Sequence, residues 1–146
     1  MALLDTNTQV SAIIGDFGSG LDHPECITWG CDGYAYAGGE AGQIYRIDLA
    51  ARTFEEFANV GGFVGGICQD AQHRLYVCNG DVKRVDPDGT VEVYCDHAGD
   101  VPLNVANYPV FDAAGNLYVS DSGGWLKNDG WICKIAPGGT GEVWNR

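Results

Sequence analysis

Two side chains that are suited to holding a cation occupy the same position in a repeating pattern. Glu25 and Asn107 each lie eleven residues before a tyrosine of the repeat, and Gly65 has the same spacing from a third tyrosine. Carboxylate and carboxamide oxygens are hard donors that suit a calcium- or magnesium-like ion, or a ligand rich in hydroxyl groups. The alternative is that Glu25 is an exposed turn residue and that Asn107 fixes a local turn.

Three further residues are candidates for contacting a ligand. Asp121 follows a predicted strand and precedes an insertion, residues 122–130, that is longer than the equivalent connections elsewhere. Long loops often carry function, so Trp125 in this insertion is a candidate roof over the site, or else a residue packed on its own sheet. His23 lies two residues before Glu25, which makes it a candidate proton carrier or an incidental neighbour.

The elements that must position these residues recur about every 40 residues. Tyr36, Tyr76 and Tyr118 mark equivalent points, 40 and 42 residues apart, and each follows a short apolar run and a turn. A period of this length with strand-like pieces inside it is typical of β-propeller blades. We therefore predict an all-β fold, a β-propeller made of three four-stranded blades at about residues 21–60, 61–100 and 101–146, after an N-terminal strand and lead-in over residues 1–20.

Turn residues and short apolar runs set the bounds of the expected strands. They are Cys26–Trp29, Tyr34–Ala37, Gln43–Asp48 and Thr53–Ala58 in the first repeat, Gly66–Gln69, Arg74–Cys78, Val82–Asp86 and Thr90–Cys95 in the second, and Tyr108–Asp112, Asn116–Ser120, Trp131–Ala136 and Gly141–Trp144 in the third.

Three blades do not close a ring, because propellers have about 4–8 blades around a channel. The chain is therefore expected to be half of a six-bladed propeller completed by a second copy as a homodimer, or a truncated piece. The segment Thr8–Ile14 is predicted as a further strand. In a dimer it would complete the third blade of the partner, in competition with the strand Gly141–Trp144.

Composition limits the classes of partner. The formal net charge is −12 and the sequence pI is about 4.3, whereas binding to nucleic acid needs a positive surface. No apolar run reaches 18 residues, so no membrane partner is expected, and the first ten residues lack the pattern of a signal peptide. We therefore expect a cytoplasmic protein. The sequence also contains neither a nucleophile elbow nor a phosphate-binding loop.

The chain contains six cysteines, and five of them fall in predicted strands. Cysteine in a strand behaves as a small apolar residue, so we expect reduced thiols. A disulfide between Cys68 and Cys78 is the alternative, and the absence of a C-x-x-C pair argues against a structural zinc site.

The segments that begin at His23, Gly65 and Asn107 resemble the senescence marker protein/gluconolactonase/luciferin-regenerating family, and also the related strictosidine-synthase-like propellers. They read HPECITWGCDGYAYAGGEAGQIYRID, GGICQDAQHRLYVCNGDVKRVDPDGTVEV and NYPVFDAAGNLYVSDSG. The more specific features are the Pro24-Glu25 pair and Asn107 placed eight residues before Gly115. The likeness covers roughly residues 20–145 and corresponds to the first half of a family member.

The resemblance implies that Glu25 is a ligand of a divalent metal, calcium in the first place with zinc or magnesium as alternatives, and that Asn107 contacts substrate. It implies a lactonase, in which the metal polarises the ester carbonyl and a carboxylate helps to activate water. Tyr108 stands where the family usually has Asp, and Val105 where it often has Arg. The later metal-binding residues of the family fall in a half that this sequence does not contain.

Two functions follow from these observations. The first is gluconolactonase-like hydrolysis of a sugar or small lactone, which requires a second half to complete the channel. The second is a non-catalytic half-propeller that binds a small ligand or a protein partner.

Overall fold

Every regular element in the computed structural model of this protein is a β-strand within the described residues, 20–145. The predicted strand Thr8–Ile14 lies outside this range. The strands are β1 Ile27–Trp29, β2 Ala35–Gly38, β3 Gln43–Asp48, β4 Thr53–Asn59, β5 Ile67–Gln69, β6 Leu75–Asn79, β7 Asp81–Val85, β8 Val91–Cys95, β9 His97–Ala98, β10 Val101–Pro102, β11 Ala106–Phe111, β12 Leu117–Asp121, β13 Trp131–Ile135 and β14 Gly141–Asn145. In the described part of the chain no helix is long and apolar enough to cross a membrane.

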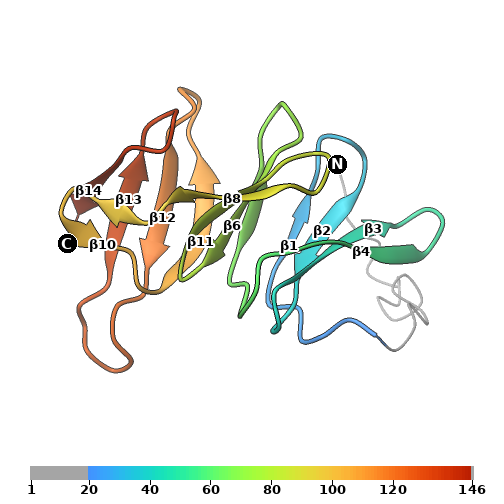
Figure 1. Ribbon diagram of the computed structural model, residues 1–146, viewed down its shortest axis with the longest axis horizontal. Helices are drawn as coiled ribbons and strands as arrows, with labels where there is room; N and C mark the ends of the chain where they lie inside the picture. Colours follow the sequence, from blue (N-terminus) through green and yellow to red (C-terminus); the bar gives the residue numbers. More distant parts are fainter. Residues whose placement is uncertain (1–19, 146) are drawn as a thin grey trace, which may run out of the picture.

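The strands form three sheets, which Figure 1 shows side by side along the long axis of the molecule. The first sheet has the order β1-β2-β3-β4 and the second the order β5-β6-β7-β8, each with antiparallel neighbours. The third has six strands in the order β10-β9-β14-β13-β12-β11. The predicted all-β arrangement of antiparallel four-stranded units is therefore present, and the twelve expected strands coincide with β1–β8 and β11–β14.

The third sheet departs from the expected four strands because β9 and β10 add a short hairpin. The hairpin turns at Gly99, whose φ is +61°, and Ala98 pairs in parallel with Gly141 of β14. Each added strand has two residues. A segment this short has no readable periodicity, which is why the sequence pattern did not predict it.

Two apolar layers fill the spaces between the sheets. Residues that alternate along the strands point into them, as in β12 and β13, where every second residue is buried. The layer between the first and second sheets contains Tyr36, Ile44, Val60, Val64, Ile67, Leu75, Val77 and Val85. The layer between the second and third contains Tyr76, Cys78, Val82, Cys95, Ala98, Leu103, Ala106, Leu117, Val119, Trp131, Cys133 and Ile135.

Equivalent backbone hydrogen bonds join successive sheets. The N–H of Val64 donates to the carbonyl of Gly39 over 3.2 Å, and the N–H of Ala106 donates to the carbonyl of Gly80 over 3.2 Å. The two donors, Val64 and Ala106, directly precede the aligned residues Gly65 and Asn107. Both acceptors lie in the turn between the second and third strands of the preceding sheet. The same contact therefore recurs at both junctions, and β5 lies between β1 and β11.

The turns between the first and second strands of each sheet use one design. Asp32 accepts a hydrogen bond from the N–H of Tyr34, and Asp112 accepts one from the N–H of Ala114, which is the expected backbone-capping role of Asp. The left-handed position of these turns is taken by glycine in the first and third sheets and by His73, with φ +63°, in the second. The turns lie at the upper end of the molecule in Figure 1, and the loop over residues 122–130 projects at the lower end.

Candidate metal and ligand site

The structure brings two of the aligned repeat positions together. A Cβ placed on Gly65 would lie 2.8 Å from the carbonyl oxygen of Asn107, so the two backbones are in direct contact. Asn107 sits at a β-bulge, where the pairing of β11 with β12 skips from Ala106 to Tyr108, and its side chain is exposed. Bulges often re-aim side chains next to functional sites. A side chain at residue 65 would collide with the Asn107 carbonyl, so glycine permits this close approach of the two strands.

Glu25 lies two residues before β1, whereas Asn107, at the aligned repeat position, is the second residue of β11. Its side chain is exposed. The carboxylate is therefore available to a ligand, and its negative charge contributes to the electrostatics of His23 and Cys26.

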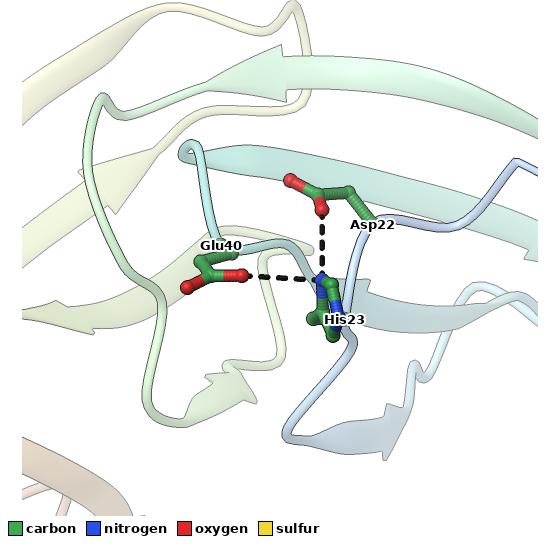
Figure 2. A group of neighbouring side chains, drawn as sticks. All are labelled: Asp22, His23 and Glu40. Carbon is green, nitrogen blue, oxygen red and sulfur yellow. Dashed lines mark hydrogen bonds and ion pairs between the residues drawn. The ribbon is translucent and has the colours of Figure 1, made fainter.

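A cluster of one imidazole and two carboxylates lies beside this end of β1. His23 Nδ1 is 3.2 Å from Asp22 Oδ1 and 3.1 Å from Glu40 Oε2 (Figure 2). His23 has a φ of +38°, an uncommon backbone conformation for a residue other than glycine. Asp22 is held in place because its Oδ2 accepts hydrogen bonds from the Ala41 N–H and the Gln43 side chain.

The charges of the cluster favour a protonated imidazole. The hydrogen bond to Asp22 raises the pKa of His23 above its usual value, and the negative charge of Glu40 acts in the same direction. The hydrogen bond from His23 in turn lowers the pKa of Asp22. Both carboxylates therefore stabilise the protonated imidazole, the form that can donate a proton.

The cluster also has the donor types of a divalent-metal site. One ligand atom from each of Asp22, His23 and Glu40 lies within 4.8 Å of the others. Three protein ligands of this mixed nitrogen and oxygen type suit a zinc-like ion with an open position, once the imidazole loses its proton. Calcium needs about 6–8 oxygen ligands, and Glu25 together with Asn107 in one copy of the chain does not supply them.

Asp22 and Glu40 were not among the residues predicted from the sequence. Their positions along the chain gave a hint. Asp22 comes before β1 and Glu40 comes after β2, and because these strands are antiparallel both residues lie at the same end of the first sheet. The carbonyl of Asp22 accepts a hydrogen bond from the N–H of Glu40 over 3.2 Å, which joins the two segments. Finding the pair required knowing that the lead-in segment folds back against this turn.

Asp121 is a buried carboxylate, with 2% of its surface exposed. Its Oδ2 accepts hydrogen bonds from the N–H groups of Asn104 and Val105, at 2.8 and 3.1 Å, and its Oδ1 accepts one from Gly123 at 2.9 Å. Asn79 has the matching place in the second sheet, where its Nδ2 donates to the carbonyls of Gly61 and Phe63.

Both side chains therefore anchor the segment that leads into the first strand of their own sheet. This anchoring gives Asp121 a structural role. Its predicted contact with substrate stays a prediction, although Asp121 does line a hollow together with Asn104, Lys127 and Asp129.

Trp125 is 90% exposed, and its neighbour Leu126 is 89% exposed. Leu126 has a φ of +63°. The loop that carries them is held by its own bonds, including one from the Gly124 N–H to Asp129 Oδ1 over 2.8 Å. The alternative that Trp125 packs on its own sheet is wrong, because such packing would cover the ring. Its predicted role as a roof over the site stays a prediction.

The cysteines are free thiols. Cys68 and Cys78, the pair considered for a disulfide, are not bonded to each other, so that alternative is wrong. Burial raises the pKa of Cys68 to about 12 and also raises that of Cys78. Neither sulfur is a thiolate near neutral pH, and neither is a candidate nucleophile.

Comparison with known proteins identifies the fold. No protein-family model matches the chain, and no curated protein matches it in sequence. Among solved structures it is similar to a gluconolactonase from Xanthomonas campestris, with a TM-score of 0.74 and 16% identity over 92% of this chain and 52% of that one. A second structure, named for a gluconolactonase, has a TM-score of 0.71 and 18% identity over 89% of this chain and 51% of that one.

The likeness confirms the resemblance noted in the sequence at the level of fold: the chain has the β-propeller fold of these gluconolactonases and spans about half their length. A similar match, with a TM-score of 0.66 and 17% identity, covers 86% of this chain and 36% of the hydrazine synthase of Kuenenia stuttgartiensis. A fold shared by proteins with such different names does not by itself assign an activity.

Proposed function

We propose that this chain forms half of a six-bladed propeller and, once a second half completes the channel, hydrolyses a sugar or small lactone with the help of a divalent metal. The placement of Glu25 and Asn107 at equivalent points beside the first strands of two sheets carries this proposal. The gluconolactonase fold supports it.

The residues of the chain would divide the work. Glu25 would hold the metal, which when bound supplies Lewis acidity toward the lactone carbonyl. Asn107, whose carboxamide can both donate and accept, would orient the ring oxygens of the substrate. His23, held between Asp22 and Glu40 at 3.2 and 3.1 Å, would take up and release the proton of the attacking water.

Titration of the protein with Ca²⁺, Zn²⁺ and Mg²⁺, followed by a pH-stat assay on a panel of sugar lactones, tests this proposal. Glu25→Gln should weaken metal binding by at least about tenfold and should abolish any metal-dependent hydrolysis. Asp100→Asn, a change of an exposed carboxylate in the turn between β9 and β10, is the matched control and should alter neither. Unchanged metal binding by Glu25→Gln would remove the basis of the metal role.

The His23 cluster can be separated from Glu25 in the same experiment. Glu40→Gln leaves Glu25 in place and removes one carboxylate from His23. If Zn²⁺ binding falls in Glu40→Gln and persists in Glu25→Gln, the metal is held by the cluster. The assignment of Glu25 as its ligand would then be wrong.

The alternative function is a non-catalytic module that binds a small ligand or a protein. The exposed Trp125 and Leu126 at the tip of the 122–130 loop favour it, because neighbouring exposed apolar side chains often mark a contact surface. Binding of a lactone without turnover, measured by calorimetry on a folded and assembled sample, would favour this alternative.

A further inference from the structure

The row of three sheets leaves two faces that no other described sheet covers. On the first sheet, Ile27 and Trp29 pair with Ala37 and Ala35, so they point away from Tyr36 and from the second sheet. Trp29 is 63% exposed.

On the third sheet, Val110 pairs with Tyr118, on the side opposite to Leu117 and Val119, which pack on the second sheet. Val110 is 56% exposed, and the ring of Trp144 lies edge-on to Tyr118 with centroids 5.5 Å apart. Each end of the row therefore presents large apolar side chains to solvent. On the first sheet these are the side chains of β1, since the rest of that face, Ala35, Ala37, Tyr45 and Ile47, is buried together with Leu21 and Phe54.

The two internal junctions show what normally covers such a face. Tyr76 of the second sheet meets the ring of Phe111 in the third, with centroids 5.0 Å apart and planes at 87°. Tyr36 of the first sheet lies beside Gln69 of the second, since both are 2.9 Å from a Cβ placed on Gly30.

Phe111 and Gln69 hold the same place in their sheets, because each pairs with the residue just before the repeat tyrosine. At both junctions the side chain at this place lies next to the tyrosine of the preceding sheet, in ring contact for Phe111 and through the shared partner Asp32 for Gln69. Trp29, which pairs with Ala35, is the equivalent residue of the first sheet.

We propose that Trp29 of one copy of this chain packs against Tyr118 and Val110 of a second copy, and that the contact is made twice. The inference rests on the six-bladed ring of the proposed function and names its second half. A second copy fits because its first sheet presents an aromatic ring at the place where Phe111 meets Tyr76. Two copies give six sheets, within the range of about 4–8 that closes a propeller.

Val110 has the place of Cys68 in the second sheet, and Cys68 packs against the layer shared with the third sheet. The third sheet thus offers the same contact points to a following sheet as the second does. A contact between two different faces either closes into a ring or propagates into a fibre. Closure after two copies gives the ring of six sheets on which the proposed function depends.

The dimer would also change the candidate site. Within one chain Gly65 lies against Asn107 at the junction of the second and third sheets. By the same relation, Glu25 of the second copy would lie beside Asn107 of the first. Each Asn107 would then have a carboxylate neighbour, and one channel would contain two of each residue.

Light scattering coupled to size exclusion, over a range of protein concentrations, tests the contact. The parent should have twice the chain mass of 15.6 kDa. Trp29→Lys and Val110→Glu should each have the mass of one chain, because a charge in an apolar contact is costly. Leu49→Lys, which adds a charge at an exposed apolar residue in the turn between β3 and β4, is the matched control and should remain a dimer.

Mixing the two variants distinguishes the proposed pairing from any other. In a dimer of Trp29→Lys with Val110→Glu, one contact is unaltered and the other places a Lys opposite a Glu. The mixture should therefore form dimers although each variant alone is a single chain. A mixture that stays at one chain mass, a parent that is monomeric at about 100 μM, or a ladder of larger species would each overturn the proposal.

The measured mass of the assembly does not depend on whether the protein hydrolyses lactones. A dimer formed by this contact without lactone hydrolysis would leave the interface standing and would refute the proposed reaction. Circular dichroism of every variant confirms that a lower mass reflects lost contact and not unfolding.

Discussion

Tyr76 and Tyr118 occupy the same position in neighbouring sheets, yet their surroundings differ. Tyr76 is 3% exposed, lies between the rings of Tyr94 and Phe111, and donates its hydroxyl to Asp70 over 3.1 Å. Tyr118 is only partly covered and has Trp144 as its ring neighbour. The side chain and the strand are equivalent, so the difference comes from the sheet that follows Tyr76. The burial of the repeat tyrosine therefore depends on the sheet that follows it, in addition to the neighbours within its own sheet.

The largest expected difference is in stability, when each of the two tyrosines is replaced in turn by alanine. Tyr76→Ala should lower the free energy of unfolding by about 3–5 kcal/mol, because it removes a fully buried ring and leaves a cavity. Tyr118→Ala in the single chain should cost about 1 kcal/mol or less. Urea denaturation at concentrations where the chain is monomeric measures both. Equal losses would mean that the following sheet does not decide the burial of the tyrosine.

A second test concerns how closely the backbones of the second and third sheets pack at their junction. A Cβ on Gly66 would lie 2.7 Å from the carbonyl oxygen of Asn107 and 2.8 Å from Pro109 Cδ. Gly66→Ala should therefore cost about 1–3 kcal/mol through overpacking. The equivalent position in the third sheet holds the exposed Tyr108, and Tyr108→Ala should change the free energy of unfolding by about 0.5 kcal/mol or less. Thermal melts of the two variants give the answer, and a neutral Gly66→Ala would show that the junction can relax.

A third test uses the anchoring side chain of the third sheet. Asp121→Asn should cost about 1–3 kcal/mol, since a carboxamide nitrogen would replace one of the oxygens that accept three backbone N–H groups. Asp129→Asn changes an exposed carboxylate in the adjoining loop and should cost less. Hydrogen exchange at Asn104 and Val105 should rise in Asp121→Asn. Protection that stays unchanged there would mean that other contacts hold the lead-in segment.

The smallest expected effect is a dependence on pH at the exposed end of the first sheet. The pKa of His23 is raised in the folded chain by its hydrogen bond to Asp22. Its contribution to stability is therefore present below the unfolded value of about 6.5 and is lost as the pH rises through the higher folded value. The melting temperature of the parent should exceed that of His23→Gln by more at pH 6 than at pH 8. A difference that is the same at both pH values would contradict the ion pairs of His23.

The strands were predictable because their period and turns are local properties. The Asp-Pro-Asp-Gly segment that ends at Gly89 is an example, since the Gly89 N–H bonds the carbonyl of Asp86 over 2.8 Å and Gly89 has a φ of +85°. The site was less predictable. Repeat counting located Glu25 and Asn107, but the contact of Glu40 with His23 depends on a chain segment that folds back across the sheet.

The amino-acid sequence by itself determined the repeat of about 40 residues, the all-β composition, the turn positions and the alignment of Glu25, Gly65 and Asn107, because these depend on spacing along the chain. The tertiary structure decided which tyrosines are buried, that Asp121 binds backbone N–H groups, and that Asp22, His23 and Glu40 meet. Those properties arise from segments that are distant in sequence and adjacent in space, and spacing along one chain does not contain that information.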